Sequence, residues 1–140
     1  LAKISTERSL FLFHDPIPWT FKMATRNNGA LERNEAWTGD IWKLVHIFID
    51  AGLKENLSLL SSAPSGLLAV LNPKAEAIEK LEKNYGQICA RWLEVELGED
   101  TVLNFYETGL FTKPEAYLQS LANTSFGNKE AIRARDWVSQ

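Results

Sequence analysis

Apolar residues recur with helical spacing in the stretch 34–51. One face carries apolar side chains at the i, i+3, i+4 and i+7 positions, namely Ile41, Leu44, Val45 and Phe48. The opposite side is also apolar, with Trp42, Ile47 and Ile49. A helix that is apolar almost all round is typical of the centre of a domain. Because Gly52 follows, and glycine is favoured just after a helix end, we expect a central helix over 34–51.

A second stretch, 73–97, has the most regular pattern in the chain. Asn72 and Pro73 are favoured at the N-cap and the first position of a helix. The apolar side chains that follow step by three and four, namely Ile78, Leu81, Tyr85, Ile88, Trp92 and Val95. This stripe faces either the core of a bundle, which we favour, or a coiled-coil seam between subunits. Gly86 in the helix interior indicates that either another segment of this chain or a partner packs closely there.

Shorter segments complete the prediction of a helical domain. Leucine-rich stretches within 54–71, divided by a Ser-, Pro- and Gly-containing break at 61–66, predict two short helices. Further helices are expected at three places, namely 101–108, 112–122 and 129–138. The predicted fold class is therefore mainly α: a single-domain bundle of about five to seven helices.

The first 30 residues have a different pattern. Residues 9–14 and 19–23 are short aromatic runs, and the second alternates apolar and polar side chains with the period of a half-buried strand. Pro16 and Pro18 between them predict a turn or an extended corner. We therefore divide the chain into an extended or hairpin N-terminal arm, 1–30, and a helical domain, 31–140.

Composition and charge narrow the class of protein. A chain of 140 residues, 45% of them apolar, can bury a core that needs neither disulfide nor metal. Cys89 is the one cysteine, which excludes an intrachain disulfide and fits an intracellular, cytoplasmic setting. No signal peptide and no apolar stretch of about 20 residues is present, so we expect no membrane association. The first residue is Leu1, and we expect the domain to be part of a larger protein.

Candidate catalytic groups are few. His46 and Asp50 are four residues apart on one predicted helix, so the carboxylate could orient the imidazole of a catalytic base. A purely structural hydrogen bond is the interpretation we favour. Cys89 could pair with His14 or His46, but its place beside the apolar stripe favours a buried thiol. Zinc, EF-hand and glycine-rich phosphate motifs are absent from the sequence, so we expect no metal and no cofactor and lean away from an enzyme.

The surplus of aromatic side chains favours binding instead. The chain has five tryptophans and seven phenylalanines without a convincing catalytic set. We predict a non-enzymatic module for protein–protein interaction or self-assembly, with another protein or a second copy as partner. The candidate interaction residues are Phe11, Phe13, Trp19, Phe21, Tyr85 and Trp92. The aromatic side chains of the arm could dock onto a neighbouring subunit or onto their own domain.

A nucleic-acid-associated domain is the alternative. Its candidate phosphate contacts are Lys22, Arg26, Arg133 and Arg135. The isoelectric point of about 5.4 counts against it, because nucleic-acid-binding domains usually carry a basic footprint. The acidic excess lies in Glu94, Glu96, Glu99, Asp100 and Glu107, which could attract a cation or a basic partner. We favour a solvated surface there.

Overall fold

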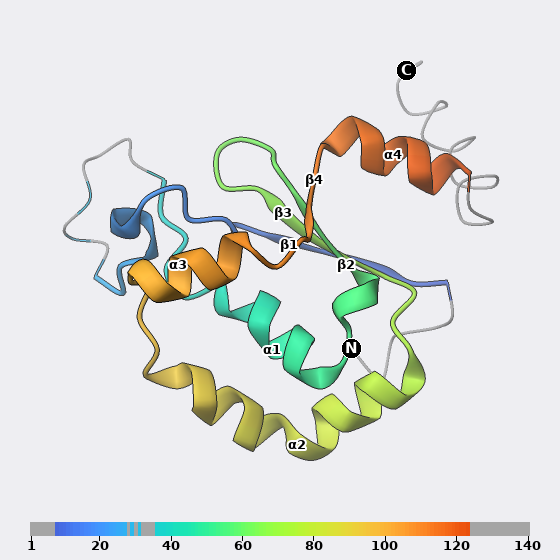
Figure 1. The fold of residues 1–140 in the computed structure, drawn as a ribbon, viewed down its shortest axis with the longest axis horizontal. Helices are drawn as coiled ribbons and strands as arrows, with labels where there is room; N and C mark the ends of the chain where they lie inside the picture. Colours follow the sequence, from blue (N-terminus) through green and yellow to red (C-terminus); the bar gives the residue numbers. More distant parts are fainter. Residues whose placement is uncertain (1–7, 28, 30, 32–35, 124–140) are drawn as a thin grey trace.

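The computed structural model describes residues 8–27, 29, 31 and 36–123. These residues form four strands and four α-helices in the order β1-α1-β2-β3-α2-α3-β4-α4 (Figure 1). The strands are β1 (Leu10–His14), β2 (Leu57–Leu60), β3 (Leu67–Leu71) and β4 (Phe111–Thr112). The helices are α1 (Lys43–Ala51), α2 (Ala75–Leu93), α3 (Glu99–Tyr106) and α4 (Pro114–Ala122). The short 3-10 helices η1 (Phe21–Ala24) and η3 (Lys54–Asn56) lie before α1 and before β2. The expected bundle of five to seven helices is wrong, and the fold is mixed α/β.

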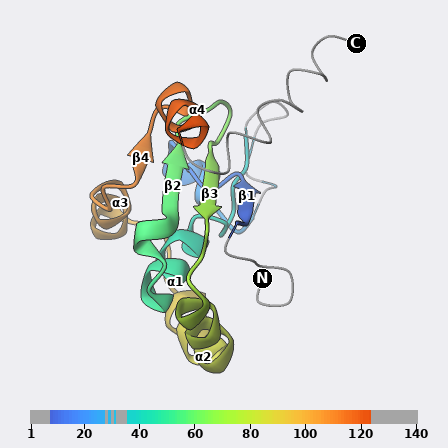
Figure 2. The ribbon, with the colours of Figure 1, turned by 90° about the vertical axis from the view of Figure 1, so that its right-hand side faces the viewer.

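The four strands form one mixed sheet in the order β1-β3-β2-β4. β3 pairs antiparallel with both β1 and β2, whereas β4 runs parallel to β2. Figure 2 shows β1 at one edge of this sheet and β4 toward the other. The first strand of the arm is therefore joined through β3 to a hairpin from the middle of the chain.

Side chains of opposite strand faces pack into two apolar clusters. On one face, Leu59, Leu68 and Val70 belong to the main core, together with buried side chains of α1, α2 and α3. On the other face, Leu60 and Ala69 pack with Tyr117 of α4. Both views place α1 and α2 on one side of the strands and α4 on the other (Figures 1 and 2). The sheet is thus covered on both faces.

This double coverage explains why the two short helices expected within 54–71 are wrong. Leucine is a good helix former, and the stretch contains six leucines. Strands buried on both faces show no alternation of apolar and polar residues, so their period is hidden. The break at 61–66 is the loop of the β2–β3 hairpin. Gly66 has φ +74° there, and a Cβ on it would collide with Ile17.

The helices predicted over 34–51 and 73–97 are present as α1 and α2, but both are shorter than predicted. α1 ends at Ala51 as expected, with Gly52 at φ +93° donating its N–H to Phe48 and Ile49 carbonyls. It starts at Lys43, and the residues just before it form turns. α2 buries Ile78 and Ile88 against α1 and the sheet.

The first alternative for Gly86 is wrong, because nothing lies within 4 Å of a Cβ built on this residue and no other described segment of the chain packs closely against α2 there. Packing of a partner against Gly86 stays a prediction. The neighbouring Tyr85 is 61% exposed. The apolar stripe of α2 therefore reaches solvent near its middle.

The N-terminal segment was predicted in part. Residues 10–14 form β1, as the aromatic run indicated, but β1 pairs with β3 and not with 19–23, so the expected hairpin is wrong. Residues 21–24 form η1, because the Thr20 side chain caps the Met23 N–H and starts a helical turn. The helix expected at 129–138 lies outside the described residues, and the domain boundary at residue 30 stays a prediction.

Candidate interaction groove

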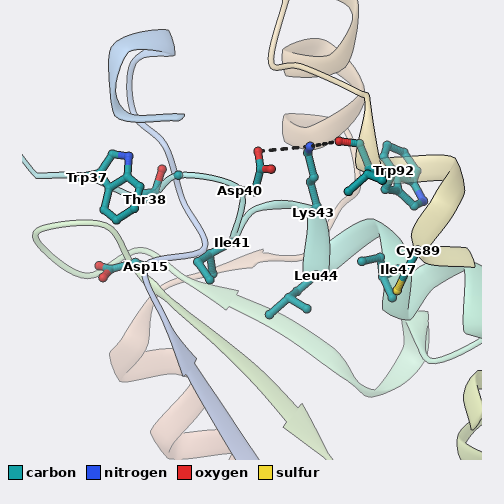
Figure 3. A pocket seen from close by; sticks show the side chains of 12 residues that line it. Asp15, Trp37, Thr38, Asp40, Ile41, Lys43, Leu44, Ile47, Cys89 and Trp92 are labelled. Atoms are coloured by element: carbon teal, nitrogen blue, oxygen red, sulfur yellow. Dashed lines mark hydrogen bonds and ion pairs between the residues drawn. The ribbon is translucent and has the colours of Figure 1, made fainter. Parts of the chain in front are cut away.

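A groove of about 440 Å³ opens between α1, the C-terminal end of α2 and the turn before α1 (Figure 3). Most of its lining is apolar, and only a few polar groups reach it. The lining residues are Asp15, Trp37, Thr38, Gly39, Asp40, Ile41, Lys43, Leu44, Ile47, Cys89, Trp92 and Leu93. We call this surface the α1–α2 groove.

The groove exists because α1 is apolar on more than one side. Val45 and Phe48 are buried in the main core, whereas Leu44 and Ile47 are half-buried and line the groove. α2 supplies the opposite wall with Cys89, Trp92 and Leu93. A helix with a single apolar face would present polar side chains to solvent on this side. The second apolar side of α1 therefore creates the binding surface.

The rim of the groove carries large apolar side chains that remain in contact with water. Trp37 is 46% exposed, Ile41 39% and Leu93 62%. The indole of Trp37 is held in place, because its Nε1 donates to the Thr25 carbonyl at 2.6 Å and its ring packs on Gly39. Gly39 has φ +51°, and a Cβ on it would lie 3.0 Å from the ring. The rim is therefore partly preformed.

An ion-pair network fixes the turn before α1 to the end of α2. The buried Lys43 Nζ lies 3.1 Å from the Asp40 carboxylate and donates to the Leu93 carbonyl at 3.2 Å (Figure 3). Arg26 Nε donates to the same Asp40 at 2.9 Å, and its Nη2 donates to the Leu93 carbonyl. Cations at the last carbonyls of a helix satisfy acceptors that no backbone N–H reaches. The two walls of the groove are thereby held together.

Asp15 supplies the negative charge at one end of the groove, beside Trp37 (Figure 3). Its carboxylate accepts a hydrogen bond from the Ser65 hydroxyl and lies 2.8 Å from His14 Nδ1. The residue has φ 64°, a left-handed conformation that aspartate tolerates better than most side chains. Among the described lining residues Lys43 is the one basic side chain, and it pairs with Asp40.

His46 and Asp50 are close on α1, but they do not form the expected pair. Asp50 Oδ2 accepts from Trp92 Nε1 at 2.9 Å and from Arg91 at 2.8 Å. The His46 ring stacks on Trp92 at 4.4 Å, and its buried Nε2 has no hydrogen-bond partner among the described residues. Burial lowers the pKa of His46, and the nearby Asp50 carboxylate opposes this only in part. His46 does not line the groove, and its contacts position the Trp92 indole.

The aromatic residues proposed for interaction fall into three environments. Phe11 and Phe13 pack against the main core of their own chain, and the Phe13 ring lies 5.5 Å from Phe48. Trp19 and Phe21 are 44% and 53% exposed at the surface. Trp92 alone among the six predicted residues lines the groove. The structure does not bring the six together in one surface.

The residues proposed for phosphate contact do not form one basic surface among the described residues. Arg26 is held by Asp40 and the Leu93 carbonyl, and Glu94 lies 4.0 Å away. Lys22 is exposed on η1. Arg133 and Arg135 lie outside the described residues. The arginine that sequence analysis assigned to phosphate is therefore already neutralised by carboxylates.

Sequence analysis missed most of the groove. Asp15, Trp37 and Leu93 are distant in sequence, and none belongs to a motif. The one available signal was the second apolar side of the 34–51 stretch, which was assigned to burial at the centre of a bundle. Its Ile47 is half-buried and lines the groove instead.

In the part of the chain that is described, no three His, Cys, Asp or Glu side chains lie close enough to share a metal ion. No helix in the described ranges is both long and apolar enough to cross a membrane. Comparisons with protein families, with curated proteins and with solved structures found no match to this chain.

Proposed function

We propose that this domain is a protein-interaction module whose α1–α2 groove binds an apolar segment of a partner protein. The observation that carries the proposal is the groove itself, about 440 Å³ in volume, with Trp37, Ile41 and Leu93 exposed along its rim. Exposed apolar surface around a concave site is typical of binding surfaces, since leaving it in water is unfavourable. A short amphipathic segment fits such a groove through a few large side chains.

The charge of the groove favours a partner segment with a basic residue. Asp15 lies at one end without an arginine or lysine among the lining residues beside it. Asp40 is partly exposed, although Lys43 and Arg26 already pair with it. A lysine or arginine on the partner would therefore meet a carboxylate at the Asp15 end and apolar side chains elsewhere.

The setting we propose is intracellular and cytoplasmic, with a protein as partner. Cys89 is an unpaired thiol that lines the groove, and unpaired thiols persist in reducing compartments. The nucleic-acid alternative loses support, because Arg26 is held by Asp40. Self-association through Phe11 and Phe13 loses support for a similar reason, since both rings pack in their own core.

The test starts from a random peptide library displayed on phage and selected on the wild-type domain. We expect enriched peptides to share large apolar residues at helical spacing and one lysine or arginine. Their affinity should fall at least about tenfold, or about 1.4 kcal/mol, for Ile41→Glu and for Leu93→Asp. Both side chains are exposed, so the variants should fold normally. Asp15→Asn should weaken binding of the basic peptides and reduce its salt dependence.

The matched control is Leu118→Asp. Leu118 is 64% exposed on α4 and does not line the groove, so this variant should bind the selected peptides like the wild type. Failure to enrich any peptide would overturn the proposal. Peptides that bind Ile41→Glu and Leu93→Asp as tightly as the wild type would place the binding surface elsewhere and overturn it as well.

A further inference from the structure

We propose that β1 pairs antiparallel with β1 of a second copy, centred on Leu12, to form a closed two-fold dimer with a continuous sheet. This goes beyond the groove, because β1 supplies no residue between 10 and 14 to its lining.

The outer edge of β1 carries backbone groups for which the described part of the chain provides no hydrogen-bond partner. In the antiparallel ladder with β3, Asn72 N donates to Ser9 O and Asp15 N donates to Gly66 O. Antiparallel pairs alternate, so the odd-numbered residues between these two bonds also face β3. The N–H and C=O groups of Leu10, Leu12 and His14 therefore point away from the sheet, at the edge shown in Figure 2.

This edge lacks the features that usually prevent strand pairing. Natural edge strands are blunted by lysine, proline, bulges or very short length. β1 has five residues, the sequence Leu-Phe-Leu-Phe-His, no proline and no lysine. Leu12 at its centre is 55% exposed. An exposed apolar strand edge of this kind is a template for pairing with another strand.

A second copy of β1 fits the edge without a charge conflict. Two-fold pairing about Leu12 places Leu12 opposite itself and Leu10 opposite His14 of the second copy. The outward N–H and C=O groups then meet acceptors and donors in register. A charged residue at the centre would face its own charge, which destabilises a strand pair, and the central residue here is leucine.

The opposite edge of the sheet explains why the pairing closes at two copies. β4 has two residues, Phe111 and Thr112, and Lys113-Pro114 follow directly. An edge of two residues is too short to accept a five-residue strand. β1 is therefore the one edge in the described sheet that can extend it, and a β1–β1 contact leaves no further edge for a fibre.

A charge exchange at position 12 tests the register. The wild type should sediment at twice 15.8 kDa, and Leu12→Glu and Leu12→Lys should each sediment at 15.8 kDa. An equimolar mixture of the two variants should recover the dimer, because residue 12 of one copy faces residue 12 of the other. Leu118→Glu, on an exposed position of α4, should leave the wild-type dimer intact.

Amide hydrogen exchange provides a second readout. In the dimer the amides of Leu10, Leu12 and His14 should be protected, and in Leu12→Glu they should exchange freely. The amides of Phe11 and Phe13, which face β3, should be protected in both.

A wild type that stays at 15.8 kDa would overturn the proposal. So would a mixture that fails to dimerise. The groove variants Ile41→Glu and Leu93→Asp should remain dimeric, so failure of one proposal is distinguishable from failure of the other.

Discussion

His46 lies among the rings of Trp42, Trp92 and Phe105, where water is largely excluded. Burial lowers its pKa, with the Asp50 carboxylate acting weakly in the opposite direction. In the unfolded chain the imidazole has its ordinary pKa of about 6.5. Below that pH the unfolded chain takes up a proton that the folded protein resists. The free energy of unfolding should therefore decrease as the pH falls below about 6.5, until the lowered pKa of the folded state is passed.

Urea unfolding at about pH 7.5 and pH 5 measures this dependence. The free energy of unfolding should decrease less in His46→Gln than in the wild type, because the variant has no titratable group at position 46. Leu118→Gln is the matched control, since Leu118 is 64% exposed and carries no titratable group, and it should keep the wild-type decrease. Equal decreases in the wild type and His46→Gln would contradict the account of the buried imidazole.

Gly86 has free space around it in the interior of α2. Glycine is less favourable than alanine in a helix interior by about 0.5–1 kcal/mol. We therefore expect Gly86→Ala to raise the free energy of unfolding by about that amount. Gly52→Ala, at φ +93°, should lower it, although space is free there too, because alanine strains in this conformation. A destabilised Gly86→Ala would mean that another segment packs on α2 after all.

At the scale of elements, the patterns in the sequence located α1, α2, α3 and α4 but missed the sheet. The i, i+3, i+4 pattern of Ile78, Leu81 and Ile88 marks a helix that faces a core on one side, and the sequence displays that directly. β2 and β3 are rich in leucine and buried on both faces. Their strand conformation depends on β1 and on α4, which lie far away in the sequence. A single short segment could not reveal it.

Asp50 joins α1 to α2 through Trp92 and Arg91, and the two contacts should differ in strength. Asp50→Ala removes the acceptor for the half-buried Trp92 Nε1 and should lower the free energy of unfolding by about 1–2 kcal/mol. Arg91→Ala breaks an ion pair whose arginine side chain is 66% exposed and should cost less than about 1 kcal/mol. Denaturant unfolding measures both values. Equal costs for the two variants would contradict the importance assigned to the Trp92 hydrogen bond.

At the scale of the whole molecule, the candidate site joins segments that no local pattern connects. Asp15 follows β1, Trp37 and Ile41 precede α1, and Cys89 and Leu93 end α2. Sequence analysis identified Trp92 as an interaction residue and α1 as unusually apolar. It could not show that the extra apolar side of α1 faces solvent, because that depends on where α2 ends and on the Lys43 contacts at that end.

The central claim is that partners bind in the α1–α2 groove, and the single cysteine of the chain allows it to be tested most directly. Cys89 lines the groove and is partly exposed, so its alkylation by iodoacetamide reports on access to that surface alone. We predict that a peptide selected on the wild-type domain slows alkylation of Cys89 in proportion to its occupancy, and that it no longer does so in Leu93→Asp. An alkylation rate that stays unchanged at saturating peptide would contradict the assignment of the groove as the binding site.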